Sequence, residues 1–308
     1  MPAKLRKTPL EGIVVPMCTP LVGNDQLDRE GLQRLTESLL AAGVGGLFLL
    51  GSTGEGPSVN DSTKRDLVRR VCQQTAGRVP VLVCVTDAAW GDALSLARHA
   101  ADCDADAIVF APPYYFKPSQ RDLYEFASQL IDASPLPTVL YNMPGFTHCE
   151  FEAETVKRLL DDSQVIGVKD SSGDLDYFEA IAGLVRQRDD CSLFMGPEEL
   201  LSQAMSLGAD GGVCGGGNVQ PQLFVDWHRA LAEGRLDDAA TLQRRVAELG
   251  KIYRVPSDAT SPFIVGIKTA LELSGVCSGM PALPSQRPSR AQREEIASKL
   301  VEIGVLQA

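Results

Sequence analysis

The chain has 308 residues, of which 44% are hydrophobic and 22% charged, and its formal net charge is −11 at pH 7. This length and composition are ordinary for a globular enzyme of one domain, or of one domain with an appendage. The negative charge argues against a nucleic-acid partner, because phosphate binding needs a basic surface. No run of eighteen apolar residues occurs, so the sequence predicts no membrane span.

The first residues and the cysteines indicate the cellular compartment. Residues 1–7 are basic but lead into no apolar signal core, which predicts a cytoplasmic protein. The eight cysteines are dispersed without a Cys-x-x-Cys pair, so we expect buried thiols in a reducing compartment. The three histidines have no metal-binding spacing, and we expect no metal ion in the site.

Short apolar runs alternate with longer amphipathic runs over about 225 residues. The pattern predicts strands at 12–18, 46–50, 80–85, 107–111, 138–142, 165–169, 192–195 and 211–214. It predicts helices at 29–42, 61–76, 91–103, 119–133, 152–161, 174–188, 198–207 and 221–233. Eight strand–helix units of this kind favour an α/β fold, a (β/α)8 TIM barrel, over an open doubly wound sheet. The first strand is also not followed by Gly-x-Gly-x-x-Gly, which weakens a dinucleotide-binding alternative.

The last quarter of the chain differs from this pattern. After about residue 234 only helices are predicted, at 235–254, 262–274 and 290–304. The sequence therefore predicts a barrel domain over residues 8–234 that carries the active site. A C-terminal extension of three helices is predicted over residues 235–308.

Polar residues follow several of the predicted strands, and the carboxyl ends of barrel strands converge on one face. The second strand runs into Gly51, Ser52 and Thr53. Two hydroxyls beside glycines, together with exposed backbone N–H groups, can bind a carboxylate. An ordinary glycine-rich loop is the alternative.

Three later strand ends carry further candidates. The turn after the fourth strand presents the phenols of Tyr114 and Tyr115. The fifth strand ends near Tyr141, whose phenol can donate and accept a proton, although a packed aromatic ring is the alternative. The eighth strand ends in a glycine-rich stretch around Val213, where a ligand can approach the backbone.

Lys169 ends the sixth predicted strand and is followed by the polar run that begins with Asp170 and Ser171. A lysine at the end of a buried strand is poorly solvated, which favours its neutral amine. A neutral amine can attack a ketone and form a Schiff base. The alternative is a lysine that reaches solvent from the barrel rim and has no chemical role.

Four motifs occur in order along the chain: Gly51-Ser52-Thr53-Gly54-Glu55, Pro113-Tyr114-Tyr115, Tyr141-Asn142-Met143-Pro144 and Gly167-Val168-Lys169-Asp170. Their order and spacing resemble the N-acetylneuraminate lyase/dihydrodipicolinate synthase family of class I, Schiff-base-forming pyruvate aldolases. The resemblance runs from about residue 12 into the C-terminal helices. It implies a lyase without an external cofactor, because a protonated imine on Lys169 would serve as the electron sink.

The resemblance also implies a role for each candidate. Lys169 would form the imine with pyruvate or a longer 2-oxo acid, and Tyr141 would be the general acid and base. Ser52 and Thr53 would hold the carboxylate. Tyr115 would reach a neighbouring subunit and complete a proton relay with Thr53 and Tyr141, so a homo-oligomer, either a dimer or a tetramer, is expected. The other substrate-binding candidates are Gly51, Phe146, Ser171 and the backbone near Val213.

Phe146 departs from the synthase pattern. Synthases of the family carry an arginine two residues after Tyr-Asn-x-Pro, which grips the carboxylate of an incoming semialdehyde. Phenylalanine cannot form a bidentate ion pair, which disfavours 4-hydroxy-tetrahydrodipicolinate synthase. The sequence favours a lyase that makes or breaks a bond between pyruvate and an aldehyde, on a 2-keto-3-deoxy sugar acid or a related 2-oxo acid. A 2-keto-3-deoxy acid dehydratase and a non-catalytic 2-oxo acid sensor stay open as alternatives.

A second lysine, Lys268, also follows an apolar run. Its surroundings predict a helix, from which the side chain is expected to reach solvent. We therefore expect Lys169→Ala to abolish turnover and Lys268→Ala not to abolish it.

Overall fold

The structure is a computed structural model, and it describes residues 10–307. The basic segment 1–7, the start of the predicted barrel domain at residues 8 and 9, and residue 308 lie outside the described residues.

Eight parallel strands close into a barrel, which confirms the predicted fold class. Their order around the barrel is β1, β10, β9, β8, β7, β6, β5 and β4. Every residue of β4 to β9 is buried, as expected for short strands rich in branched and aromatic side chains. The strands are β1 (Gly12–Pro16), β4 (Gly46–Leu49), β5 (Val81–Cys84), β6 (Ala107–Phe110), β7 (Thr138–Asn142), β8 (Val165–Asp170), β9 (Ser192–Met195) and β10 (Gly211–Gly212).

Helices alternate with the barrel strands along the chain, and after the last strand the chain contains further helices up to its C-terminal part. Several begin at a side chain that caps the first turn: Asn60 accepts from the Thr63 N–H and Ser119 from the Asp122 N–H. The helices are α1 (Arg29–Ala41), α2 (Asp61–Thr75), α3 (Trp90–Asp102), α4 (Gln120–Ala133), α5 (Pro144–Thr147), α6 (Ala153–Leu160), α7 (Leu175–Val185), α8 (Leu201–Ser206), α9 (Pro221–Ala232), α10 (Leu236–Gly250), α11 (Pro262–Leu273) and α12 (Arg290–Glu302).

The structure differs from the sequence prediction in several short elements. The last strand stops at Gly212 because a 3-10 turn, Gly215–Asn218, follows closely. The helix expected at 198–207 is a 3-10 turn, Glu198–Leu200, followed by α8. The one-turn helix α5 and the hairpin formed by β2 (Leu21–Gly23) and β3 (Gln26–Leu27) were not predicted. Elements this short show no helical or strand period in the sequence.

The chain divides into two compact units, and the division does not follow the predicted boundary at residue 234. Among the described residues, the first unit contains residues 10–14, Gly45–Phe48 and Val79–Val213, and the second contains Val15–Val44, Leu49–Arg78 and residues 214–307. The predicted domain boundaries stay a prediction.

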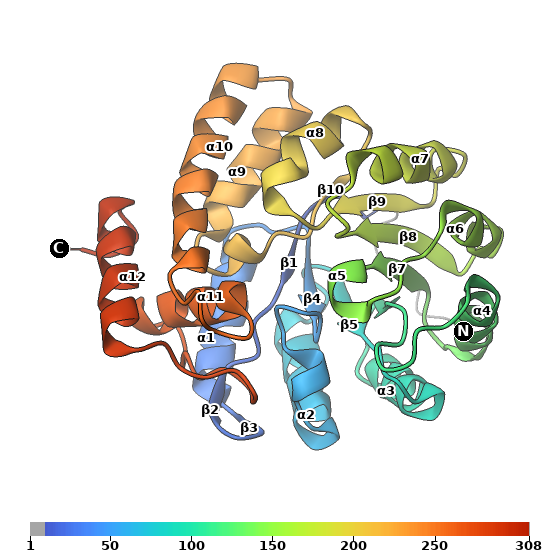
Figure 1. Ribbon diagram of the computed structural model, residues 1–308, viewed down its shortest axis with the longest axis horizontal. Helices are drawn as coiled ribbons and strands as arrows, with labels where there is room; N and C mark the ends of the chain where they lie inside the picture. The colour runs from blue at the N-terminus through green and yellow to red at the C-terminus, as the bar shows by residue number, and fades with distance from the viewer. Residues whose placement is uncertain (1–9, 308) are drawn as a thin grey trace. The chain divides into compact units, whose positions relative to one another are not determined.

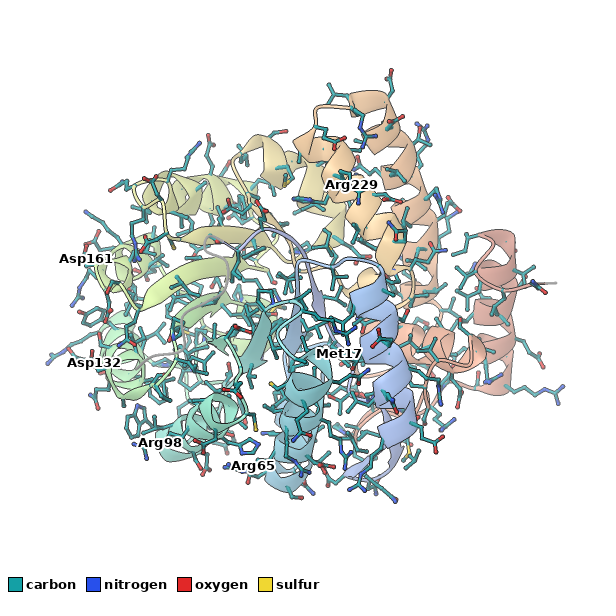
Figure 2. All side chains as sticks on the ribbon, turned by 180° about the vertical axis from the view of Figure 1, so that it is seen from behind. Met17, Arg65, Arg98, Asp132, Asp161 and Arg229 are labelled. Carbon is teal, nitrogen blue, oxygen red and sulfur yellow. The ribbon has the colours of Figure 1, made fainter. Side chains whose placement is uncertain are left out.

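Each unit packs its helices against neighbouring elements. In the first unit, α3, α4, α6 and α7 lie outside strands β5 to β9 (Figure 1). In the second unit, α9 and α10 lie side by side (Figure 1). Arg98, Asp132 and Asp161 project from the outer side of the helices in the first unit (Figure 2). Among residues 10–307, no helix is long and apolar enough to cross a membrane.

Candidate active site

Lys169 and Tyr141 lie opposite each other on the adjacent parallel strands β8 and β7. The Lys169 Nζ is 3.8 Å from the centre of the Tyr141 ring and 4.9 Å from the centre of the Phe48 ring. The two rings meet edge to face with centroids 6.1 Å apart. Only 6% of Lys169 is exposed. The amine therefore lies between two aromatic rings, largely shielded from bulk water, at the end of a rigid strand.

The next residue pair on the same strands, Asn142 and Asp170, forms a hydrogen-bonded clamp. Successive strand side chains point to opposite faces, so this pair lies on the other side of the sheet from Tyr141 and Lys169. Asn142 Nδ2 donates to Asp170 Oδ1 at 2.8 Å. The bond fixes the register that places Lys169 next to Tyr141.

Asp170 is fully buried, which raises the pKa of its carboxyl. Hydrogen bonds from Asn142 and Ser172 partly offset this effect. The Ser172 N–H donates to Asp170 Oδ1 at 3.1 Å, and the Ser172 hydroxyl donates to Oδ2 at 2.9 Å. The carboxyl is thus a hydrogen-bond acceptor that organises the polar turn after Lys169.

The clamp also reaches the segment that follows α5. Asn142 Oδ1 accepts from the Phe151 N–H at 3.1 Å, and the Tyr177 hydroxyl donates to the Phe151 carbonyl at 2.6 Å. Burial and the nearby Asp170 raise the pKa of Tyr177, so its phenol stays protonated and can donate. The ends of β7 and β8 and the start of α7 are joined in one network.

The turn at residues 51–56 belongs to the second unit. It follows β4 and carries the predicted carboxylate ligands Ser52 and Thr53, of which Thr53 is buried and Ser52 half-buried. The Glu55 N–H donates to the Ser52 carbonyl at 3.0 Å, and the Thr19 hydroxyl donates to the Gly54 carbonyl at 2.6 Å. The hydroxyls of the turn are thus presented by a tightly bonded backbone.

The other predicted residues differ in exposure. Tyr115 is 78% exposed on the loop after β6, and Phe146 is 54% exposed on α5. Ser171 is half-buried, and its N–H donates to the Asn142 carbonyl at 2.8 Å. Val213 is buried after β10, and its N–H donates to the Met195 carbonyl at 2.8 Å. The structure thus brings Lys169 and Tyr141 together in the first unit and leaves Tyr115 and Phe146 on exposed surfaces.

Metal-ligating clusters and disulfides do not occur in the part of the chain that the structure describes. Residues 10–307 contain no group of three or more His, Cys, Asp or Glu side chains arranged to hold a metal ion. Within the same residues, no two cysteines are joined in a disulfide. The groups gathered around the Lys169 amine are a phenol and a second aromatic ring.

Comparison with known proteins places the chain in a family. The model of the dihydrodipicolinate synthetase family matches residues 9–303. The chain belongs to this family. It is accordingly a carbon–carbon lyase, as the resemblance implied.

Relatives within the dihydrodipicolinate synthetase family carry two kinds of name. The chain is 32% identical to a 4-hydroxy-tetrahydrodipicolinate synthase of Methanopyrus kandleri, over 96% of this chain and 97% of the relative. It is also 32% identical to a probable 2-dehydro-3-deoxy-D-pentonate aldolase, YjhH, of Escherichia coli K12, over 95% of each chain. Equal identity to a synthase and an aldolase leaves the choice of substrate to particular residues.

Solved structures agree with this family assignment. A dihydrodipicolinate synthase from Bacteroides thetaiotaomicron superposes with a TM-score of 0.93 at 39% identity, over 96% of this chain and 99% of that one. YagE from E. coli K12, a member of the same family solved in complex with pyruvate, superposes with a TM-score of 0.91 at 28% identity, over 97% and 100% of the two chains.

Sequence reasoning missed Phe48, Asn142 and Asp170 as parts of the site. Phe48 lies within an apolar strand, where the sequence predicts an ordinary core residue. Its contact with the Lys169 amine is evident only from the structure. Asn142 and Asp170 each directly follow a predicted catalytic residue at a strand end. This common position, one residue after the catalytic candidate on each strand, was the available signal. Two residues at the same position on neighbouring paired strands lie close together.

Proposed function

We propose that the protein is a class I aldolase that cleaves a 2-keto-3-deoxy sugar acid to pyruvate and an aldehyde, or catalyses the reverse reaction, through an imine on Lys169. The observation that carries the proposal is the buried Lys169 amine against the Tyr141 ring. A lysine deprived of water and adjacent to a phenol is suited to nucleophilic attack with proton transfer nearby. No external cofactor is required.

The chemistry follows from these two groups. The Lys169 amine attacks the C2 ketone carbon, and water leaves as the imine forms. When the C3–C4 bond breaks, its electron pair flows into the protonated imine and the C4 hydroxyl loses its proton, which releases an aldehyde. The resulting enamine takes a proton at C3, and water then cleaves the imine to give pyruvate and the amine. Tyr141 is proposed to shuttle these protons.

Phe146 supports a sugar-acid aldehyde over a charged semialdehyde. It lies on α5, two residues after Tyr141-Asn142-Met143-Pro144, at the position where the synthases carry their arginine. An exposed ring at this position offers no positive charge to a second carboxylate. The aldehyde half of the substrate is therefore proposed to be uncharged.

The remaining assignments are part of the same proposal. Ser52 and Thr53, with the Gly51 backbone, are proposed to hold the carboxylate of the 2-oxo acid. Ser171 and the backbone at Val213 are proposed to contact the substrate. Tyr115 is proposed to act at a site of a neighbouring subunit in a homo-oligomer.

Borohydride trapping tests the proposal. Sodium borohydride reduces an imine to a stable secondary amine, so incubation with pyruvate should leave one adduct on the peptide that contains Lys169. Lys169→Met should remove the adduct. Lys157→Met should keep it, because Lys157 is an exposed lysine on α6. A folded protein that gives no adduct, or an adduct on another lysine, would contradict the assignment.

Product analysis then separates the remaining activities. Release of pyruvate from a 2-keto-3-deoxy sugar acid is the expected result. Formation of a dioxo-acid semialdehyde without pyruvate would identify a dehydratase instead. Efficient condensation of pyruvate with aspartate semialdehyde would identify a synthase and would contradict the interpretation of Phe146.

A further inference from the structure

A buried ion pair joins the turn after β4 to α11, one of the helices that follow the barrel strands in sequence. The Lys268 ammonium, which is 0% exposed, pairs with the Glu55 carboxylate, which is also buried. The sequence-based expectation that Lys268 reaches solvent is therefore wrong. Its helix α11 is buried along most of its length, so the side chain has no route to water. Both residues belong to the second unit.

Each member of the pair is held by the segment at residues 280–282. Lys268 Nζ donates to the Met280 carbonyl at 2.8 Å. The Ala282 N–H donates to Glu55 Oε1 at 2.7 Å. The ion pair therefore ties the turn, α11 and the segment after α11 together.

The neighbouring thiols add no competing charge. Cys18 and Cys277 are buried close to the pair. Burial raises the pKa of both thiols, that of Cys277 to about 12, so they stay protonated at neutral pH. Lys268 is thus left as the charged partner of Glu55.

The turn itself has a conformation that needs support. Leu50 and Glu55, which lie on either side of Ser52 and Thr53, have φ values of 60° and 55°. Side chains with a Cβ disfavour this left-handed region, and such residues persist only where the surroundings hold them. Gly56 closes the turn, and a Cβ there would lie 2.0 Å from the Leu50 carbonyl oxygen. The carboxylate of Glu55 is the anchor at one end of this strained turn.

Stability alone does not account for the pair. Desolvating two charges cancels much of their attraction, so a neutral pair of similar volume is often as stable. The pair and its bonds to residues 280–282 do, however, connect the turn to α11 at several points. The pair is therefore suited to fixing where the turn lies.

We propose that Lys268 and Glu55 are a positioning pair that holds the Ser52–Thr53 turn in the geometry needed to bind the carboxylate of the 2-oxo acid. The inference rests on the proposed function for the role of Ser52 and Thr53. It gives α11, a helix beyond the barrel strands, an indirect part in substrate binding.

The test compares Glu55→Gln/Lys268→Met with the wild type. The double variant removes both charges but keeps the volume, and the introduced glutamine can still accept from the Ala282 N–H, so the fold should survive. We expect amide hydrogen exchange at residues 51–58 to become at least about tenfold faster, because local opening controls exchange. We expect the KM for pyruvate to rise about tenfold or more with a smaller change in kcat, as misplaced binding groups produce.

Thr269→Val is the matched control. Thr269 is the next residue on α11, is buried, and donates to the Val265 carbonyl at 2.7 Å. The Thr269→Val variant should show the wild-type rate of amide hydrogen exchange at residues 51–58 and the wild-type KM for pyruvate.

The outcomes separate this proposal from the proposed function. Wild-type exchange and KM in the double variant would overturn the positioning role. Faster exchange with an unchanged KM would overturn the link to carboxylate binding. If the wild type itself forms no pyruvate adduct, the proposed function fails, and hydrogen exchange still decides whether the pair positions the turn.

Discussion

At the scale of single residues, the two buried lysines have different neighbours. Lys169 and Lys268 both lie at or near the end of an apolar run, and both are buried. The Lys169 amine lies against two aromatic rings, whereas Lys268 faces a carboxylate. The nitrogen of Lys268 is therefore engaged in an ion pair. Lys268→Ala is still not expected to abolish turnover, although it would leave the Glu55 charge buried without its partner.

Phe146→Arg should change the preference for the aldehyde. A guanidinium can bind a carboxylate with two parallel hydrogen bonds, which phenylalanine cannot do. We expect condensation of pyruvate with aspartate semialdehyde to rise by roughly tenfold or more, as one charge-assisted hydrogen-bond pair of ~1.5–3 kcal/mol allows. Steady-state kinetics with both aldehydes measure the change. Phe146→Leu is the control and should show no such rise, and an equal gain in both variants would rule out the charge explanation.

At the scale of secondary-structure elements, the paired strands β7 and β8 position the chemistry. Tyr141 and Lys169 face one side of the sheet. Asn142 and Asp170 face the other side, where they form a hydrogen bond. The Asn142–Asp170 hydrogen bond thus lies on the opposite side of the sheet from Lys169 and Tyr141. Its acceptor, the Asp170 carboxyl, is buried.

Asp170→Asn should alter how stability depends on pH. Burial raises the pKa of Asp170 in the folded chain, so the folded state binds that proton more tightly than the unfolded state does. The stability from this proton is present below the unfolded pKa, about 3.9 for an aspartate, and is lost as pH rises through the folded value. The melting temperature of the wild type relative to Asp170→Asn should therefore fall between about pH 4 and neutral pH.

Asp190→Asn is the control for this experiment. The hydrogen bond from Arg188 lowers the pKa of Asp190, so its effect should have the opposite sign, and it should be small because the pair is at the surface. Equal pH trends in the two variants would contradict the assignment to Asp170.

The same elements explain how far the sequence could predict the structure. β7 and β9 have the predicted bounds, since their apolar runs are flanked by residues that end strands. β8 is one residue longer because Asp170 continues to pair with Asn142 and Met195. Lys169 and Tyr141 were predictable because each directly ends an apolar run. The Glu55–Lys268 pair was not, because its members are 213 positions apart in sequence.

At the scale of the whole molecule, two exposed aromatic side chains are candidates for the interface of the proposed homo-oligomer. Tyr115 and Phe116 are 78% and 81% exposed, and their rings meet edge to face at 5.0 Å. The homo-oligomer expected from the sequence would cover them.

Tyr115→Ala/Phe116→Ala should therefore lower the mass of the protein in solution, measured by light scattering after size exclusion. Tyr115→Phe should keep the assembly but lower kcat, by about 10²-fold if its hydroxyl transfers a proton. Leu236→Ala, which changes an exposed leucine on α10, should leave both mass and rate unchanged. A fully active monomer would rule out a role for Tyr115 across an interface.

The proposed role of the ion pair on α11 makes the C-terminal part of the chain necessary for substrate binding. A gene shortened after α9 would still encode all eight strands, Lys169 and Tyr141. It would lack Lys268 and the segment at residues 280–282, and the Glu55 carboxylate would lose both of its partners. Designers who transplant the Ser52–Thr53 turn into another barrel would therefore have to move a helix from the far end of the chain with it.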